Sequence, residues 1–198
     1  MKRKMDNHTT HLFTIILLIF FTACQQDSKN DTQLDKGVKL RLLPYGIPPD
    51  FASKNAQSVI AEKWGLEFYR VGGCALTEEL VDSVRRHNKK VEALIEKKYG
   101  KSWEVTFDKE INEELNKQKI AYSLLDKEKR ITIKQTALLK EGNALQYHFK
   151  KLTNGTYIVS VTGWGKIKGK DAYVSYFRYL VDIENKQVKL TSDRVIKE

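Results

Sequence analysis

The feature that most constrains this chain is an apolar run near its start, which ends abruptly at a cysteine. Residues 12–21 contain one polar side chain, Thr14, and the small residues Thr22 and Ala23 follow them before Cys24. This run is too short for a mature transmembrane helix, because such a helix needs roughly 20 residues to cross the hydrocarbon core. A basic segment comes before the run and a polar segment after it, an order typical of a targeting segment that is removed.

The stretch LFTIILLIFFTAC (12–24) resembles the end of a bacterial lipoprotein signal peptide. The basic residues 2–4 match the positive start of such a signal, which stays in the cytoplasm while the apolar segment enters the membrane. Phe21 stands where these signals usually carry Leu. The resemblance implies that residues 1–23 are removed and that Cys24 receives a diacylglyceryl group. The protein would then be lipid-anchored on the extracytoplasmic face of the cell envelope, where nucleic acid is not an expected partner.

The residues that follow Cys24 predict a flexible tether. The stretch QQDSKNDTQLDKG (25–37) holds one large apolar residue, Leu34, which is too little apolar surface to offset the entropy lost on folding. A coil of this length spans about 20 Å. We therefore expect a tether over 24–37 and a single domain over 38–198, a length that suits one hydrophobic core.

The first half of this domain predicts short strands and several helices. Pro44 ends a strand over Val38–Leu43, and alternating apolar residues indicate another strand at Leu66–Val71. The predicted helices cover about 55–63, Glu78–Tyr99 and 107–125. The clearest is Glu78–Tyr99, because Thr77 can cap it, acidic residues fill its first turn, and Gly100 follows its basic last turn. Thr106 is the expected cap of the last helix.

His87 and Asn88 interrupt the apolar stripe of the helix at Glu78–Tyr99. Together with Cys74, they permit a catalytic interpretation in which Cys74 is the nucleophile, His87 the base and Asn88 its orienting partner. Neighbouring helical residues point about 100° apart, however, so Asn88 is poorly placed to orient His87. The favoured interpretation is a hydrogen-bonded polar pair, with Cys74 as a small buried apolar residue.

From Arg130 onward, apolar residues alternate with a period of two, which indicates strands separated by short turns. Asn154-Gly155 predicts a hairpin with a type I′ turn. The chain is thus predicted to be an α+β protein in which a long helix packs on a curved antiparallel meander of four to five strands. The predicted strands are Ile131–Leu139, Ala144–Leu152, Thr156–Trp164, Ala172–Glu184 and Gln187–Ser192.

The order of elements over 77–192 resembles the cystatin-like and NTF2-like folds, in which a curved antiparallel sheet wraps a helix. The closing stretch YFRYLVDIENKQVKL (176–190) is similar to the last hairpin of PepSY-type modules. Such folds host binding, inhibitory and enzymatic functions, so the resemblance implies no particular activity and no site residue.

The longest predicted strand has two unlike faces. The more uniformly apolar one is assigned to the core, and Tyr176, Arg178 and Asp182 are expected on the other face, either exposed or in a groove. The residues assigned to the core are Tyr173, Ser175, Phe177, Tyr179, Val181 and Ile183.

The segment GWGKIKGK (163–170) is the candidate binding site, because it places an indole beside three lysines that alternate onto one side of an extended chain. This combination suits an anionic envelope polymer or lipid headgroup. A solvated turn with Trp164 folded back onto the sheet is the plainer interpretation, since lysines at hairpin ends also prevent edge aggregation. The candidate binding residues are Trp164, Lys166, Lys168, Lys170, Tyr176 and Arg178.

The sequence contains no phosphate-binding glycine loop, no nucleophile elbow and no HExxH motif, so no metal or cofactor is expected. Two function classes remain. The first is a non-enzymatic lipoprotein that binds or scaffolds an envelope protein, an anionic envelope polymer such as peptidoglycan, or a small apolar ligand in the crevice between helix and sheet. The alternative is a small envelope hydrolase or isomerase with its site in the concavity of the sheet, where two carboxylates could pair.

Overall fold

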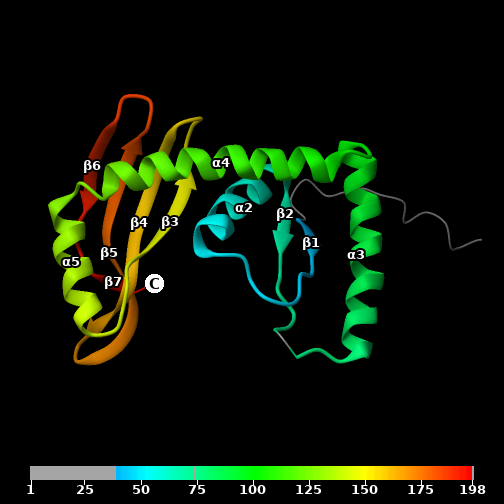
Figure 1. The fold of residues 1–198 in the computed structure, drawn as a ribbon, viewed down its shortest axis with the longest axis horizontal. Helices are drawn as coiled ribbons and strands as arrows, with labels where there is room; N and C mark the ends of the chain where they lie inside the picture. Colours follow the sequence, from blue (N-terminus) through cyan, green and yellow to red (C-terminus); the bar gives the residue numbers. More distant parts are fainter. Residues whose placement is uncertain (1–38, 74, 198) are drawn as a thin grey trace, which may run out of the picture. The chain divides into compact units, whose positions relative to one another are not determined.

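The structure is a computed structural model that describes residues 39–73 and 75–197. The predicted signal peptide, the tether, Cys24 and Cys74 lie outside this part. Helices fill most of its first two thirds, and an antiparallel meander fills the last third (Figure 1). The predicted α+β class with an antiparallel meander is therefore confirmed.

A parallel sheet of two strands begins the described chain. β1 (Leu40–Leu42) pairs with β2 (Leu66–Phe68), and α2 (Phe51–Trp64) connects them. The side chain of Asp50 caps α2, and Gly65 ends it in the left-handed conformation, with a φ of 65°. Both strands lie within their predicted ranges, and the helix is longer at both ends than predicted.

α3 (Glu78–Tyr99) has the bounds that its end signals predict. The Thr77 hydroxyl accepts a hydrogen bond from the backbone N–H of Leu80 at 3.3 Å, which satisfies one of the free donors of the first turn. Val84, Val91 and Ile95 are buried on one face of the helix, against β1 and α4.

α4 (Trp103–Leu125) begins one turn before the predicted start, because Trp103 and Phe107 are both buried and extend its packing face. The expected cap, Thr106, instead lies in the first turn, where its hydroxyl donates to the Ser102 carbonyl at 3.1 Å. Two hydrophobic clusters share this helix. Its first turns pack with β1, β2, α2 and α3, and its last turns pack against the antiparallel sheet (Figure 1).

α5 (Lys129–Lys140) shows that the prediction of a strand at Ile131–Leu139 was wrong. Ile131 and Leu138 lie two helical turns apart and are both buried, whereas Ile133 and Leu139 are each 60% exposed. Apolar Ile131 and Ile133 alternate with polar residues at the start of this stretch, and over so few positions a strand pattern cannot be told from a helical one.

The antiparallel sheet has the strand order β3-β4-β5-β6, and a short final strand also pairs with β5. Its first four strands correspond to the remaining predicted strands, and the fifth was not predicted. The pairing of β3 with β4 ends at the residue pair Gln146–Thr162, whereas the pairing of β4 with β5 continues as far as Ile167. The β4–β5 hairpin therefore extends beyond β3. The strands are β3 (Gln146–Lys151), β4 (Thr156–Ile167), β5 (Lys170–Asp182), β6 (Gln187–Ser192) and β7 (Ile196–Lys197).

The backbone that a type I′ turn requires occurs in a different hairpin from the predicted one. Asn154-Gly155 does connect β3 and β4, but of the two only Gly155 has a positive φ, so the predicted turn type was wrong. Between β4 and β5, Lys168 and Gly169 have φ angles of 51° and 78°. Both central residues of that turn are thus left-handed, as a type I′ turn requires.

A bulge in β5 brings Val174 and Tyr176 to the core, which corrects the predicted faces of this strand. The pairing with β4 skips Tyr176, which is the extra residue. Because side chains alternate along a strand, one extra residue moves all later positions to the other face. Tyr179 and Val181 are therefore buried as predicted, but Tyr176, expected on the exposed face, is 5% exposed.

Candidate binding site at the β4–β5 hairpin

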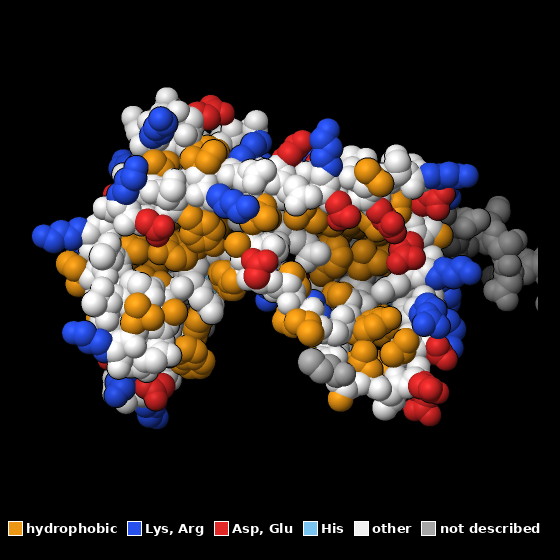
Figure 2. All heavy atoms as spheres, viewed as in Figure 1, with side chains coloured by type: hydrophobic (Ala, Val, Ile, Leu, Met, Phe, Trp, Pro, Cys, Tyr) orange, Lys and Arg blue, Asp and Glu red, His pale blue; other side chains and the backbone are white. Residues whose placement is uncertain are grey.

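The end of the β4–β5 hairpin carries four of the six predicted binding residues, and Tyr176 and Arg178 lie further along β5. Trp164 is 54% exposed, and its ring also meets the ring of Tyr173 in β5, so the indole lies partly on the sheet and partly in solvent. Lys166, Lys168 and Lys170 are also exposed, one at the end of β4, one in the turn and one at the start of β5. In Figure 2, Lys and Arg groups gather over this hairpin end and α5, with acidic groups between them.

A cavity of about 640 Å³ lies between α5 and this hairpin. Three predicted binding residues, Trp164, Lys166 and Tyr176, line it, together with Lys134 and Glu141 of α5. The helix that replaces the predicted strand at 131–139 therefore forms one wall of the cavity. The sequence could not indicate this wall, because a strand was expected there.

Gly165 makes room for the ring of Tyr176 inside this cavity. A Cβ atom at Gly165 would collide with the Tyr176 hydroxyl. That hydroxyl donates to the Trp164 carbonyl at 2.6 Å, and Lys134 Nζ lies 4.2 Å from the centroid of the Tyr176 ring. Burial, and secondly the Glu141 carboxylate, raise the pKa of Tyr176 above its ordinary value, so its hydroxyl stays a donor at neutral pH. Tyr176 is thus a structural wall of the cavity.

The charges around the cavity have a positive surplus. Lys134 and Lys166 line it together with Asp171 and Glu141, so the surplus comes from Lys168 and Lys170 at the hairpin turn. The whole chain has a formal net charge of +10. A positive surplus of this kind attracts anions through a field that salt screens.

Arg178, the sixth predicted residue, does not line the cavity. It is exposed and lies beyond the bulge of β5, where it pairs with Ser192 of β6. Its carbonyl accepts a hydrogen bond from the Thr191 hydroxyl at 2.9 Å. The structure therefore brings five of the six predicted residues together at or near the hairpin end, whereas Arg178 lies further along β5.

The other face of the sheet carries a polar and aromatic cluster that the sequence analysis missed. The Tyr173 hydroxyl donates to Gln146 Oε1 at 2.6 Å and lies 2.7 Å from Thr162 Oγ1 and 3.2 Å from His148 Nε2. The ring of Trp164 meets the ring of Tyr173 edge-on, with centroids 5.9 Å apart. A two-residue turn at Lys168-Gly169 would have indicated this pairing, because it sets Trp164 opposite Tyr173.

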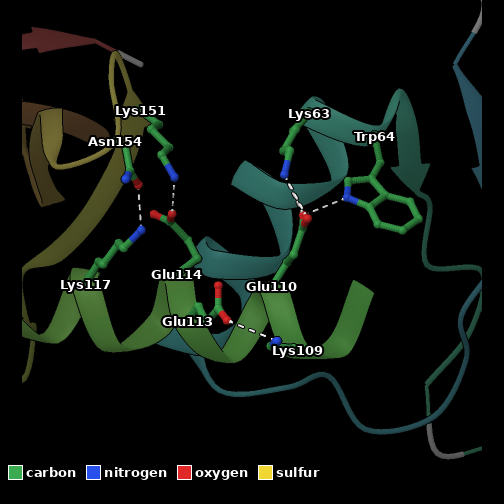
Figure 3. A network of polar contacts seen from close by, with 9 residues as sticks. All are labelled: Lys63, Trp64, Lys109, Glu110, Glu113, Glu114, Lys117, Lys151 and Asn154. Carbon is green, nitrogen blue, oxygen red and sulfur yellow. Dashed lines mark hydrogen bonds and ion pairs between the residues drawn. The ribbon is translucent and has the colours of Figure 1, made fainter. Parts of the chain in front are cut away.

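Glu110 and Glu114, two carboxylates one turn apart on α4, are both held by other side chains (Figure 3). Lys63 Nζ lies 2.8 and 2.9 Å from the two oxygens of Glu110, and Trp64 Nε1 donates to Glu110 at 2.8 Å. Burial raises the pKa of Glu110, but the hydrogen bonds from Lys63 and Trp64 outweigh it and hold the pKa below its ordinary value. Glu110 therefore fastens α2 to α4 as a carboxylate.

Glu114 fastens the sheet to the same helix (Figure 3). It is 1% exposed, lies 2.7 Å from Lys151 Nζ of β3, and accepts a hydrogen bond from Gln118 at 3.1 Å. Burial, and secondly the Glu114 carboxylate, raise the pKa of Tyr157 well above its ordinary value. Lys117 Nζ donates to Asn154 of the β3–β4 turn at 2.5 Å. This network orients the strands on α4.

His87 and Asn88, the residues of the catalytic interpretation, both contact the backbone at β1. His87 Nε2 lies 2.9 Å from the carbonyl oxygen of Arg41, and the side-chain amide of Asn88 binds the backbone of Leu43. They contact β1 and do not form a hydrogen bond with each other among the described interactions. The polar interruption of the α3 stripe is therefore explained by packing against a strand edge.

Comparisons of this chain with protein families, with curated proteins and with solved structures find no match. Across 39–73 and 75–197, no helix is both long and apolar enough to cross a bilayer. The same residues hold no group of three or more His, Cys, Asp and Glu side chains that could bind a metal ion.

Proposed function

We propose that this chain is a lipid-anchored protein of the bacterial cell envelope that binds an anionic envelope polymer without catalysing a reaction. The anchor rests on the resemblance of residues 1–24 to a lipoprotein signal peptide. A diacylglyceryl group on Cys24 and the tether over 24–37 would keep the domain within tens of ångströms of the membrane surface. Polymers of the envelope are the charged partners available at that place.

The observation that supports the binding role is the lysine-bordered cavity at the β4–β5 hairpin. Lys134 and Lys166 line it, and the exposed indole of Trp164 lies at its edge. Glu141 and Asp171 also line it, and their oxygens can accept hydrogen bonds from hydroxyl or amide groups. The site therefore suits a ligand that has anionic groups and also hydrogen-bond donors.

The test is to replace Lys166, Lys168 and Lys170 with Gln and to measure co-sedimentation with purified cell-wall material at several salt concentrations. The wild type should bind more weakly as salt rises, because the attraction is screened. The variant should bind more weakly at low salt and depend less on salt. A matched control replaces Lys89, Lys90 and Lys97, three exposed lysines of α3.

Equal losses in both triple variants would mean that only net charge matters and would remove the hairpin as the binding site. Unchanged binding of the hairpin variant would also remove the hairpin as the binding site. A specific loss in the hairpin variant supports the proposal.

A further inference from the structure

We propose that the anionic polymer is a glycan, and that its sugar rings lie on a row of aromatic side chains on the outer face of the sheet. This inference rests on the proposed function and names the ligand class for it. We call the four side chains Trp164, Tyr173, His148 and Phe51 the ring row. They come from β4, β5, β3 and α2, so only the tertiary structure brings them together.

The ring row is continuous from the hairpin to the start of α2. The centroids of Trp164 and Tyr173 are 5.9 Å apart, those of Tyr173 and His148 are 6.4 Å apart, and those of His148 and Phe51 are 5.2 Å apart. Consecutive rings are nearly perpendicular, with interplanar angles of 77°, 87° and 82°. Ring faces and ring edges therefore alternate along the row, and Trp164 and His148 are exposed.

Polar atoms lie between the rings. The Tyr173 hydroxyl is within hydrogen-bond distance of Gln146 Oε1 and Thr162 Oγ1. Thr162 is 1% exposed, so the polar groups open to a ligand in the middle of the row are the Tyr173 hydroxyl and the Gln146 amide. A sugar ring presents an apolar C–H face and a rim of hydroxyl groups. Aromatic faces with interspersed donors and acceptors match both parts, as in other sites that combine apolar walls with a few polar groups.

The charge next to the row decides which glycan fits. Trp164 ends the row, Lys166 lies two positions further along β4 on the same face, and Lys168 lies in the turn that follows. A glycan that follows the row would bring its charged groups to these two lysines, so the complementary ligand is acidic.

Two other classes of partner fit this surface less well. An extended peptide would pair with a strand edge, either along β3 or along residues 163–167 of β4, and this mode would leave the ring row on the face of the sheet unused. A lipid surface would favour a purely apolar patch, whereas hydrogen-bonding groups lie beside the rings here. The acidic glycan satisfies the rings, the polar atoms and the lysines together.

The experiment uses the full-length, lipid-modified protein in a neutral detergent and measures binding by calorimetry. The probes are polygalacturonate, which is a linear acidic glycan, and polyglutamate of matched charge, which has no sugar rings. Trp164→Ala shortens the ring row, and Tyr173→Phe removes only its central hydroxyl. The matched control is Tyr69→Ala, because Tyr69 is an aromatic residue with 56% exposure outside the row, close to the 54% of Trp164.

We expect polygalacturonate to bind the wild type more tightly than polyglutamate does. Trp164→Ala should weaken polygalacturonate binding about tenfold, because it removes one aromatic contact and the apolar area that this contact buries. Tyr173→Phe should weaken it by a smaller factor, and Tyr69→Ala should leave it unchanged. The thermal midpoint of each variant shows that it is folded.

The outcomes separate this inference from the proposed function. Equal binding of both probes, or equal binding of wild type and Trp164→Ala, would overturn the glycan inference and leave an anionic-polymer binder. If the wild type bound neither polygalacturonate nor polyglutamate, both proposals would be overturned.

Discussion

The side-chain amide of Asn88 in α3 makes two hydrogen bonds with the backbone of Leu43, the residue after β1. The N–H of Leu43 donates to Asn88 Oδ1 at 2.9 Å, and Asn88 Nδ2 donates to the Leu43 carbonyl at 3.1 Å. One amide side chain thus exchanges the same pair of bonds that a neighbouring strand residue would exchange. Because a sheet of two strands is marginal by itself, this contact helps to hold β1 in place.

Asn88→Ala should therefore destabilise the protein. The substitution leaves a partly buried N–H and C=O of Leu43 without their side-chain partner, and we expect a loss of about 2 kcal/mol in the free energy of unfolding. Urea denaturation measures this loss. Lys89→Ala, at the next and exposed position, should change the free energy by less than about 0.5 kcal/mol. Equal midpoints for Asn88→Ala and wild type would show that the two bonds contribute nothing net.

Glu114→Gln should be much more destabilising than Glu113→Gln. Glu114 is 1% exposed and pairs with Lys151, whose side chain is 28% exposed, so the substitution leaves a partly buried ammonium group unpaired. We expect a loss of about 2 kcal/mol, below the value for a fully buried pair. The Glu113 side chain is 58% exposed, 4.0 Å from Lys109, and its loss should cost less than about 1 kcal/mol. Thermal unfolding of both variants tests the difference, and similar midpoints would contradict it.

The stabilisation by Glu110 should disappear in acid. Its pKa in the folded state is below the ordinary value of 4.5, because the bonds from Lys63 and Trp64 outweigh the opposing effect of burial. Between the folded and unfolded pKa values, the unfolded chain binds more protons, so stability rises with pH there. The stabilisation is fully present above about pH 4.5 and is lost as the pH falls through the folded pKa.

The measurement for this prediction is the difference in unfolding free energy between wild type and Glu110→Gln from pH 7 to pH 3. The difference should be constant at the upper end and should shrink below about pH 4.5. Lys63→Gln should reduce the same pH dependence, because Lys63 supplies one of the bonds. A difference that stays constant down to pH 3 would rule out the depressed pKa.

Gly165→Ala and Tyr176→Phe should be strongly coupled. The added Cβ at position 165 meets the Tyr176 hydroxyl, so Gly165→Ala alone should destabilise by about 2 kcal/mol through overpacking. Tyr176→Phe removes that hydroxyl and with it the bond to the Trp164 carbonyl. The double variant should therefore be more stable than the sum of the single effects predicts. Additive effects in a double-mutant cycle would show that the ring of Tyr176 does not lie over Gly165.

Cys24→Ser should release the protein from the membrane fraction. The expected reason is the loss of the sulfur that carries the diacylglyceryl group, as the resemblance of residues 12–24 implies. Cell fractionation and intact-mass measurement detect the change, because wild type should carry the mass of the lipid and the variant should not. Wild type found without lipid and cleaved at another position would end the anchor hypothesis.

Helix α3 shows how far local signals reach. Its bounds, its Thr77 cap and its buried stripe follow from side-chain types that act within one or two turns. The reason why the polar residue Asn88 interrupts this stripe does not follow from local signals, because its hydrogen-bond partner, Leu43, lies 45 positions away in the chain. Long-range hydrogen bonds of this kind leave no local pattern.

The sequence by itself determined the α+β class, the bounds of α3 and most strands of the meander, because apolar period and end signals are local properties. Tertiary packing decided that 131–139 is helical, since burying Ile131 and Leu138 together outweighs the weak strand preference of β-branched residues. It also decided the bulge at Tyr176, which turns that side chain from the predicted surface into the cavity wall. The cavity and the ring row exist only because α5, the hairpin and α2 meet in space, and such meetings depend on non-local contacts that a single sequence does not display.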